Sequence, residues 1–75
     1  MNTATIDPSK VLQINGSKYV LNSVMTIRQL MDYLGFNQNV IVIDYNGFIL
    51  EKTLWPQTCL KNNDSLEILS IAGGG

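Results

Sequence analysis

The stretch that decides the fold is VLQINGSKYVL, residues 11–21. Two largely apolar segments flank the pair Asn15-Gly16, and Asn-Gly supplies the two positive φ angles of a type I′ turn. This turn predicts a β-hairpin and also fixes its register, with Leu12 opposite Tyr19. One face of the hairpin then carries Leu12, Ile14, Tyr19 and Leu21, and the other carries Val11, Gln13, Lys18 and Val20.

A short helix is predicted after the hairpin. Thr26 is placed to cap the first turn, and Gln29, three residues later, completes a capping-box pattern. Gly35 stands where a left-handed residue ends a helix. Between these signals, one apolar stripe is formed by Ile27, Leu30, Met31 and Leu34.

The second half of the chain alternates apolar runs with turn signals. Strands are predicted at residues 40–43, 48–50 and 66–71, with the orientation of the 40–43 side chains left open. Trp55-Pro56 is expected to break any regular element, because proline lacks a backbone N–H.

The order hairpin, helix, strand, short strand, strand predicts an α+β domain of the β-grasp (ubiquitin-like) fold. Such a fold has a mixed sheet of four to five strands with one main helix packed on one face. The first and last strands lie side by side and parallel, so the chain leaves from the centre of the sheet. We therefore predict a flexible N-terminal arm (1–9), a β-grasp domain (10–71) and a flexible glycine tail (72–75).

Composition argues against several classes of function. The 75 residues carry a net charge of −1 with no basic stripe, which disfavours nucleic-acid binding. No apolar run approaches the roughly 20 residues that cross a bilayer, and residues 1–10 do not resemble a signal peptide. We expect a soluble protein of the cytoplasm or plastid stroma, monomeric when free.

Catalytic and metal-binding groups are also missing from the pattern. There is no histidine, Cys59 is the single cysteine, and the carboxylates are dispersed without a recognisable acid–base pair. The sequence therefore predicts no metal, no bound cofactor and no catalytic residue, so the chain is expected to be a protein cosubstrate and not an enzyme.

The predicted chemical site is the tail. Gly73, Gly74 and Gly75 directly follow a predicted strand. Without Cβ atoms the segment is thin enough to enter a narrow channel of another enzyme, where ATP can convert its carboxylate into an acyl-adenylate. A sulfur nucleophile would then displace AMP and leave a thiocarboxylate. Terminal glycines are also typical of linkers and frayed ends, but these adjoin a strand with no linker serine.

The sequence resembles the ThiS family, the sulfur carriers of thiamine biosynthesis, over about residues 11–74. The likeness lies in the Asn15-Gly16 hairpin, the Thr26–Met31 helix start with Leu34-Gly35, the Ile43–Gly47 strand and turn, Trp55, the Asn63–Leu69 segment and the terminal Gly-Gly. The resemblance implies that an E1-like adenylyltransferase uses ATP to activate the terminal glycine. It further implies a sulfur donor such as a cysteine desulfurase, and thiazole synthase as the acceptor.

The chain departs from the family pattern at both ends. Its N-terminal arm is longer, and it ends in three glycines where two are common. The sulfur-carrying terminus is therefore expected to be Gly75, or Gly74 if Gly75 is trimmed or foreign.

Partner docking is predicted on the sheet face that the helix leaves uncovered. Val11, Val20, Leu69 and Ile71 are expected there as one apolar patch beside the start of the tail. Trp55 is interpreted as the edge of a small core, with a docking anchor as the alternative. Cys59 is interpreted as inert packing, with a persulfide or a transient link to a partner as the alternative.

Three other functions remain open from the sequence. A molybdopterin-synthase small subunit would share the chemistry but use a different acceptor, and the Asn-Gly hairpin and brief helix favour the thiamine branch over it. A ubiquitin-like modifier would transfer its tail to lysines. An interaction module would make no chemical use of the glycines.

Overall fold

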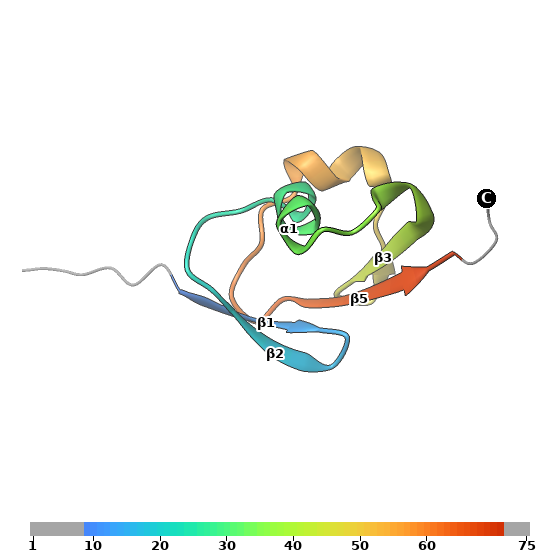
Figure 1. The fold of residues 1–75 in the computed structure, drawn as a ribbon. Coiled ribbons are helices and arrows are strands. Elements are labelled where there is room, and N and C mark those ends of the chain that lie inside the picture. The colour runs from blue at the N-terminus through green and yellow to red at the C-terminus, as the bar shows by residue number, and fades with distance from the viewer. Residues whose placement is uncertain (1–8, 72–75) are drawn as a thin grey trace, which may run out of the picture.

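The computed structural model describes residues 9–71, which form a mixed sheet with one α-helix on one face (Figure 1). The strands of this described part lie in the order β2-β1-β5-β3-β4. The elements are β1 (Lys10–Ile14), β2 (Ser17–Leu21), α1 (Ile27–Leu34), the 3-10 helix η1 (Gln38–Val40), β3 (Ile41–Tyr45), β4 (Phe48–Ile49), the 3-10 helix η2 (Lys52–Gln57) and β5 (Ser65–Ser70). The β-grasp prediction is confirmed.

The hairpin has the predicted register. Leu12 pairs with Tyr19, and Ile14 pairs with Ser17. Asn15 and Gly16 adopt φ angles of 51° and 82°, both in the left-handed region that a type I′ turn requires. The turn therefore sets which hairpin side chains face the helix.

Helix α1 begins and ends at the predicted caps. The Thr26 hydroxyl accepts a hydrogen bond from the Gln29 backbone N–H (3.1 Å), and the Gln29 side chain accepts one from the Thr26 N–H (2.9 Å). Gly35 ends the helix with a φ of 81°, a conformation that glycine adopts without strain. These caps satisfy backbone groups that would otherwise lack partners at the helix ends.

Strand β5 occupies the middle of the sheet. It pairs parallel with β1, where Ile14 lies beside Leu66, and antiparallel with β3, where Ile43 lies opposite Ile68. The chain thus returns its last strand to the centre of the sheet, as predicted.

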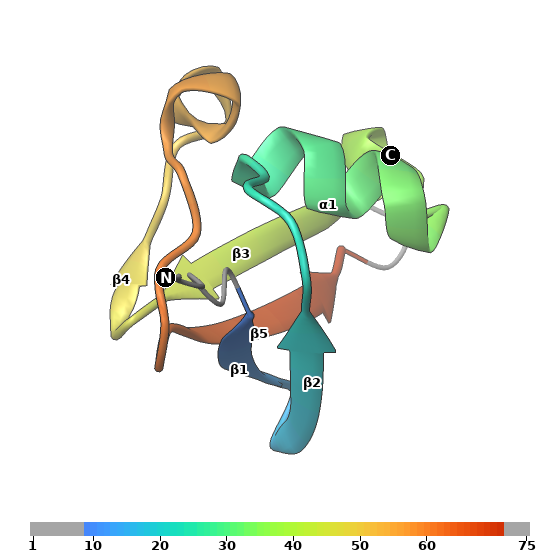
Figure 2. The ribbon, with the colours of Figure 1, turned by 90° about the vertical axis from the view of Figure 1, so that its left-hand side faces the viewer.

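The core lies between the sheet and the layer that contains α1 and η2 (Figures 1 and 2). Along β3 and β5 the buried residues alternate with more exposed ones, because side chains on a strand point to opposite faces in turn. The buried apolar side chains are Leu12, Leu21, Ile27, Leu30, Met31, Ile41, Ile43, Trp55, Leu60, Leu66 and Ile68.

Several predicted boundaries are wrong. Strand β3 runs on to Tyr45, two residues beyond its predicted end, and β4 ends at Ile49, one residue before its predicted end. Val40 belongs to η1 and not to the strand, because the Asn37 side chain accepts a hydrogen bond from the Asn39 N–H (3.1 Å) and supports a 3-10 turn first. Trp55-Pro56 lies inside η2, since the φ of proline suits a short 3-10 helix. The last strand is Ser65–Ser70, one residue earlier than predicted.

The two faces of β5 can be tested with one residue type. We expect Leu66→Ala, at a fully buried position, to lower the free energy of unfolding by about 2–5 kcal/mol because it leaves a cavity in the core. Leu69→Ala, at a position that is 46% exposed, should lower it by less than about 1 kcal/mol. Urea denaturation followed by Trp55 fluorescence measures both, and equal losses would contradict the assignment of the two leucines to opposite faces.

Candidate functional site

The candidate site is the point where β5 leads into the C-terminal tail. Ile71 is the last described residue, and its N–H donates a hydrogen bond to the carbonyl oxygen of Val40 (2.7 Å). This bond joins the end of β5 to the end of η1. The predicted sulfur-carrying terminus, with tail residues Gly73, Gly74 and Gly75, lies outside the described residues, as does most of the predicted arm 1–9.

The four predicted docking residues lie on the face that α1 leaves uncovered, but they do not form one patch. Val11 and Val20 pair with each other at one end of the hairpin. Val11 lies two residues before Gln13, and Gln13 is level with Ser65. Leu69 lies four residues after Ser65, so Val11 and Leu69 are about 20 Å apart at the rise of an extended strand. The predicted single patch is therefore wrong.

The stagger between the two parallel strands explains this separation. Strand β1 ends at Ile14, whereas β5 continues to Ser70 beside β3 alone. The face between the two apolar pairs is polar, and it carries Gln13, Lys18, Ser65 and Glu67.

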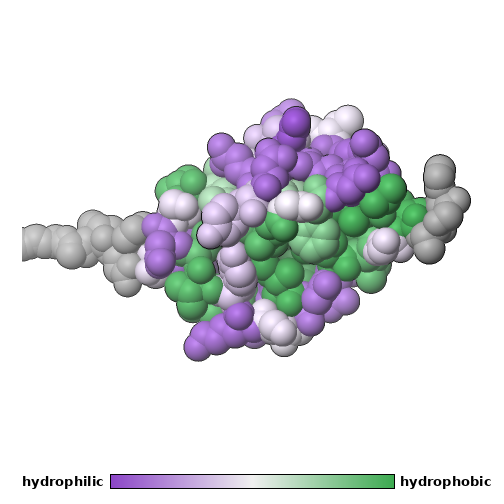
Figure 3. Space-filling model, in the orientation of Figure 1, coloured by the Kyte–Doolittle hydropathy of each residue, from purple (hydrophilic) through white to green (hydrophobic). Residues whose placement is uncertain are grey.

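A smaller apolar surface surrounds the exit of β5. Leu69 pairs with Val42, and Ile71 is hydrogen-bonded to Val40, which is 37% exposed. We call these four residues (Val40, Val42, Leu69 and Ile71) the root patch. Figure 3 shows hydrophobic surface at this end of the molecule. The sequence missed Val40 and Val42 because an unbroken apolar run does not reveal which side chains face outward.

A buried carboxylate fixes the opposite end of β5. Asp64 is 6% exposed and accepts hydrogen bonds from the Tyr45 hydroxyl (2.6 Å), the Asn46 side-chain amide (3.0 Å) and the Lys61 N–H (2.8 Å). Asn46 also accepts a hydrogen bond from the Ser65 N–H (2.7 Å). These contacts tie the β3–β4 turn to the first residue of β5.

The same contacts control the ionisation of the two side chains. Burial alone raises the pKa of Asp64, but hydrogen bonds from Tyr45, Asn46 and Lys61 outweigh burial and hold that pKa below its usual range. Burial, together with the hydrogen bond to Asp64 and its negative charge, raises the pKa of Tyr45 to about 12. From the sequence Asp64 is one of several dispersed carboxylates, since its side-chain partners Tyr45 and Asn46 are distant from it in the chain.

The burial of Trp55 and the exposure of Cys59 test the interpretation of the two residues from the sequence. Trp55 is buried in the core and its indole N–H donates to the Leu50 carbonyl (3.1 Å), so the core interpretation is confirmed and the docking-anchor alternative is wrong. Cys59 is exposed beside Thr26, to which it is joined by an isolated β-bridge. The expectation that its thiol is packed is therefore wrong, and its chemistry stays a prediction.

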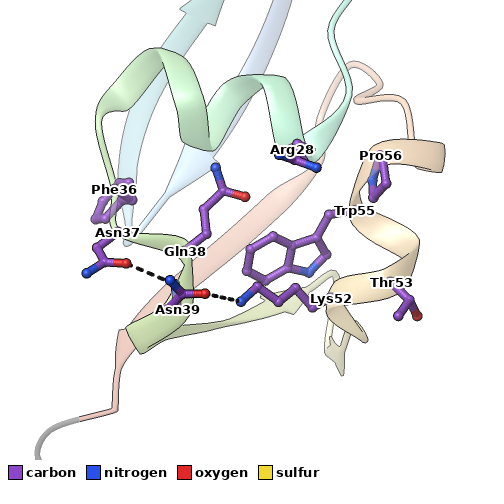
Figure 4. Close-up of a pocket in the computed structure, with 9 residues that line it drawn as sticks. All are labelled: Arg28, Phe36, Asn37, Gln38, Asn39, Lys52, Thr53, Trp55 and Pro56. Carbon is purple, nitrogen blue, oxygen red and sulfur yellow. Dashed lines mark hydrogen bonds between the residues drawn. The ribbon is translucent and has the colours of Figure 1, made fainter. Parts of the chain in front are cut away.

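A hollow of about 570 Å³ lies between α1, η1 and η2 (Figure 4). Arg28, Asn37, Gln38, Asn39 and Lys52 contribute polar groups to its lining. No cluster of potential metal ligands occurs among the described residues, and no helix of residues 9–71 is long and apolar enough to cross a membrane.

The fold and the position of its last strand define a class of protein, the ubiquitin-like β-grasp domains. The chain belongs to the ThiS family, whose family model matches residues 8–75. It is similar to the thiamine biosynthesis protein ThiS from Geobacter metallireducens, whose crystal structure matches with a TM-score of 0.76 and 26% identity, over 87% of this chain and 99% of that one.

Similar sequences include uncharacterised and named proteins. The uncharacterized protein ycf40 of Trieres chinensis is 37% identical over 70 residues, covering 93% of this chain and 96% of the relative. Its namesake in Pyropia yezoensis is 34% identical over 64 residues, covering 85% and 90%. A thiazole synthase of Paramagnetospirillum magneticum is 31% identical over 64 residues, which cover 85% of this chain but 20% of that protein.

The Asp64 contacts predict a dependence of stability on pH. Because the folded-state pKa of Asp64 is lowered, its contribution is present above the unfolded-state value of 3.8 and is lost as pH falls through the folded-state value. Asp64→Asn places an amide N–H₂ among hydrogen-bond donors, so we expect it to lower the free energy of unfolding at pH 7 by about 1–3 kcal/mol.

Urea denaturation between pH 7 and pH 2 measures this effect. The Asp64→Asn variant should lose less stability on acidification than the wild type. The control Glu67→Gln removes an exposed carboxylate from the same strand and should behave as the wild type. Equal acid sensitivity of wild type and Asp64→Asn would contradict the assigned role of Asp64.

Proposed function

We propose that this chain is a sulfur carrier of thiamine biosynthesis that acts as a protein cosubstrate. An E1-like adenylyltransferase would activate its C-terminal glycine with ATP, and the resulting thiocarboxylate would donate sulfur to thiazole synthase. The observation that carries the proposal is the family match, which extends through residue 75 and so includes the terminal glycines.

The chemistry requires activation because a free carboxylate is a poor acyl donor. Attack of the carboxylate on the α-phosphorus of ATP forms an acyl-adenylate and releases pyrophosphate. A sulfur nucleophile at the level of hydrosulfide then forms a C–S bond at the acyl carbon, and AMP leaves with the electron pair of the C–O bond. The product is a thiocarboxylate at Gly75, or at Gly74 if Gly75 is trimmed or foreign.

The body of the domain supports a carrier role rather than catalysis. The buried carboxylate of the described residues, Asp64, is engaged by three hydrogen-bond donors and faces the start of β5. Catalysis would therefore rest with the partners: the adenylyltransferase, a sulfur donor such as a cysteine desulfurase, and thiazole synthase. We place the carrier in the cytoplasm or plastid stroma, as a monomer when free.

One relative favours the thiazole branch over the molybdopterin branch. The thiazole synthase of Paramagnetospirillum magneticum contains a segment similar to this chain that accounts for 20% of its length. Joining a carrier-like segment to that enzyme in one polypeptide raises the effective concentration of the two parts. A molybdopterin-synthase small subunit, a lysine-linked modifier and an interaction module remain the alternatives to be tested.

Thiocarboxylate formation is the central test. We expect that incubation with ATP, the E1-like adenylyltransferase of the source organism and a sulfide source will raise the intact mass by the difference between sulfur and oxygen. A variant lacking residues 74–75 should not change in mass, because its new terminal carboxylate, on Gly73, ends about 7 Å short of the position that the adenylyltransferase activates. Addition of thiazole synthase and its other substrates should return the carrier to its original mass.

Each alternative has its own result in this assay. Turnover with the large molybdopterin-synthase subunit instead of thiazole synthase would indicate the molybdopterin branch. Recovery of the tail as an isopeptide on lysines of other proteins would indicate a modifier. An unchanged mass, with enzymes that are active on a control carrier, would refute the carrier proposal and leave the interaction module.

A further inference from the structure

The hollow between α1, η1 and η2 differs in charge from the protein as a whole. Arg28 and Lys52 both line it, and no aspartate or glutamate does. Over the full sequence the balance is reversed, with five lysines and arginines against six aspartates and glutamates. The lining thus concentrates positive charge in one concave part of an acidic chain.

The Arg28 guanidinium is available to a ligand. It is exposed and makes no hydrogen bond or ion pair with the part of the chain that the structure describes. Asp32, four residues later on the same helix, accepts a hydrogen bond from Gln38 instead. The planar guanidinium therefore keeps its N–H donors, which match the two oxygens of a carboxylate.

The Lys52 ammonium is held at the hollow but is not neutralised. It donates one hydrogen bond to the Asn39 side-chain oxygen (3.1 Å), which joins η2 to η1 (Figure 4). An ammonium has three donors, so two remain. Glu51, its neighbour in sequence, contacts the Thr53 hydroxyl (3.5 Å).

The hollow adjoins the root of the tail through η1. Asn39 lines it, and the next residue, Val40, accepts the hydrogen bond from Ile71 (2.7 Å). Residues 72–75 can reach about 14 Å from Ile71 at full extension. A partner that acts on Gly75 must therefore approach this end of the domain, where η1 is hydrogen-bonded to Ile71.

We propose that the hollow receives an acidic side chain of the activating adenylyltransferase, with its carboxylate between Arg28 and Lys52. This inference rests on the proposed function. The activating step consumes ATP, so recognition of the correct carrier must precede it. The short tail offers few groups for discrimination, whereas a charge contact on the folded body speeds encounter and disfavours incorrect partners.

Matched charge reversals test this contact. We expect Arg28→Glu and Lys52→Glu each to raise the KM for the carrier in ATP–pyrophosphate exchange by about tenfold at low salt, with little change in kcat. Lys18→Glu makes the same change in net charge on β2, at an exposed position outside the hollow, and should stay within about twofold of wild type. Added salt should narrow the difference between wild type and the two reversed variants.

Further variants separate charge from folding. Circular dichroism should show that each variant is folded. If a charge reversal unfolds the protein, the corresponding single variant Arg28→Gln or Lys52→Gln is tested in its place. The double variant Arg28→Lys with Lys52→Arg keeps both charges and should lose much less than the reversals, although position 28 gives up the paired donors of the guanidinium. A loss as large as that of the reversals would show that shape and not charge matters, and would refute the proposal.

The outcomes distinguish this inference from the proposed function. Absence of exchange with the wild-type carrier would refute both. If wild-type exchange is normal but Arg28→Glu and Lys52→Glu have the same KM as Lys18→Glu, only the proposed contact at the hollow is refuted. If Arg28→Glu and Lys52→Glu leave exchange unchanged but impair sulfur transfer to thiazole synthase, the assignment is also overturned. The hollow would then contact the acceptor enzyme and not the adenylyltransferase.

Discussion

The parallel pairing of β1 with β5 is the constraint on which the position of the candidate site depends. It inserts the last strand between β1 and β3, so that β5 has a hydrogen-bonded neighbour on both sides. A C-terminal strand at the edge of a sheet could separate after the loss of one set of hydrogen bonds. Strand β5 would have to lose two sets of hydrogen bonds, one to β1 and one to β3. The strand that leads into the tail is therefore held in the interior of the sheet.

The two parallel strands are staggered, and side chains compensate at both ends of β5. Where β1 stops, the Asn15 side chain accepts a hydrogen bond from the Ile68 N–H (2.6 Å) and donates one to its carbonyl (3.3 Å), which extends the pairing beyond the turn. At the other end, Asp64 collects donors from β3 and from two turns. The stagger also leaves the last residues of β5 beside β3 alone, which creates the root patch.

The sequence predicts well those features whose causes are local. The Asn15-Gly16 turn and the Thr26 capping box are determined by neighbouring residues, and both are confirmed. The buried state of Asp64 depends on Tyr45, 19 residues away, and no local signal reveals it. The predicted docking patch failed for a related reason, because alternation gives the face of a residue but not its position along a staggered neighbour.

The arrangement around η1 places two different kinds of surface side by side, which suits the sequence of partners in the proposed function. The apolar root patch and the cationic hollow meet at Asn39 and Val40, so one partner surface can contact both while it receives the tail. Apolar burial supplies affinity with little selectivity, whereas charge at the rim supplies selectivity and rapid association. Under the proposed function, dividing these roles between two small adjoining surfaces would let each complex dissociate, as a carrier that visits an activating enzyme and then a sulfur acceptor requires.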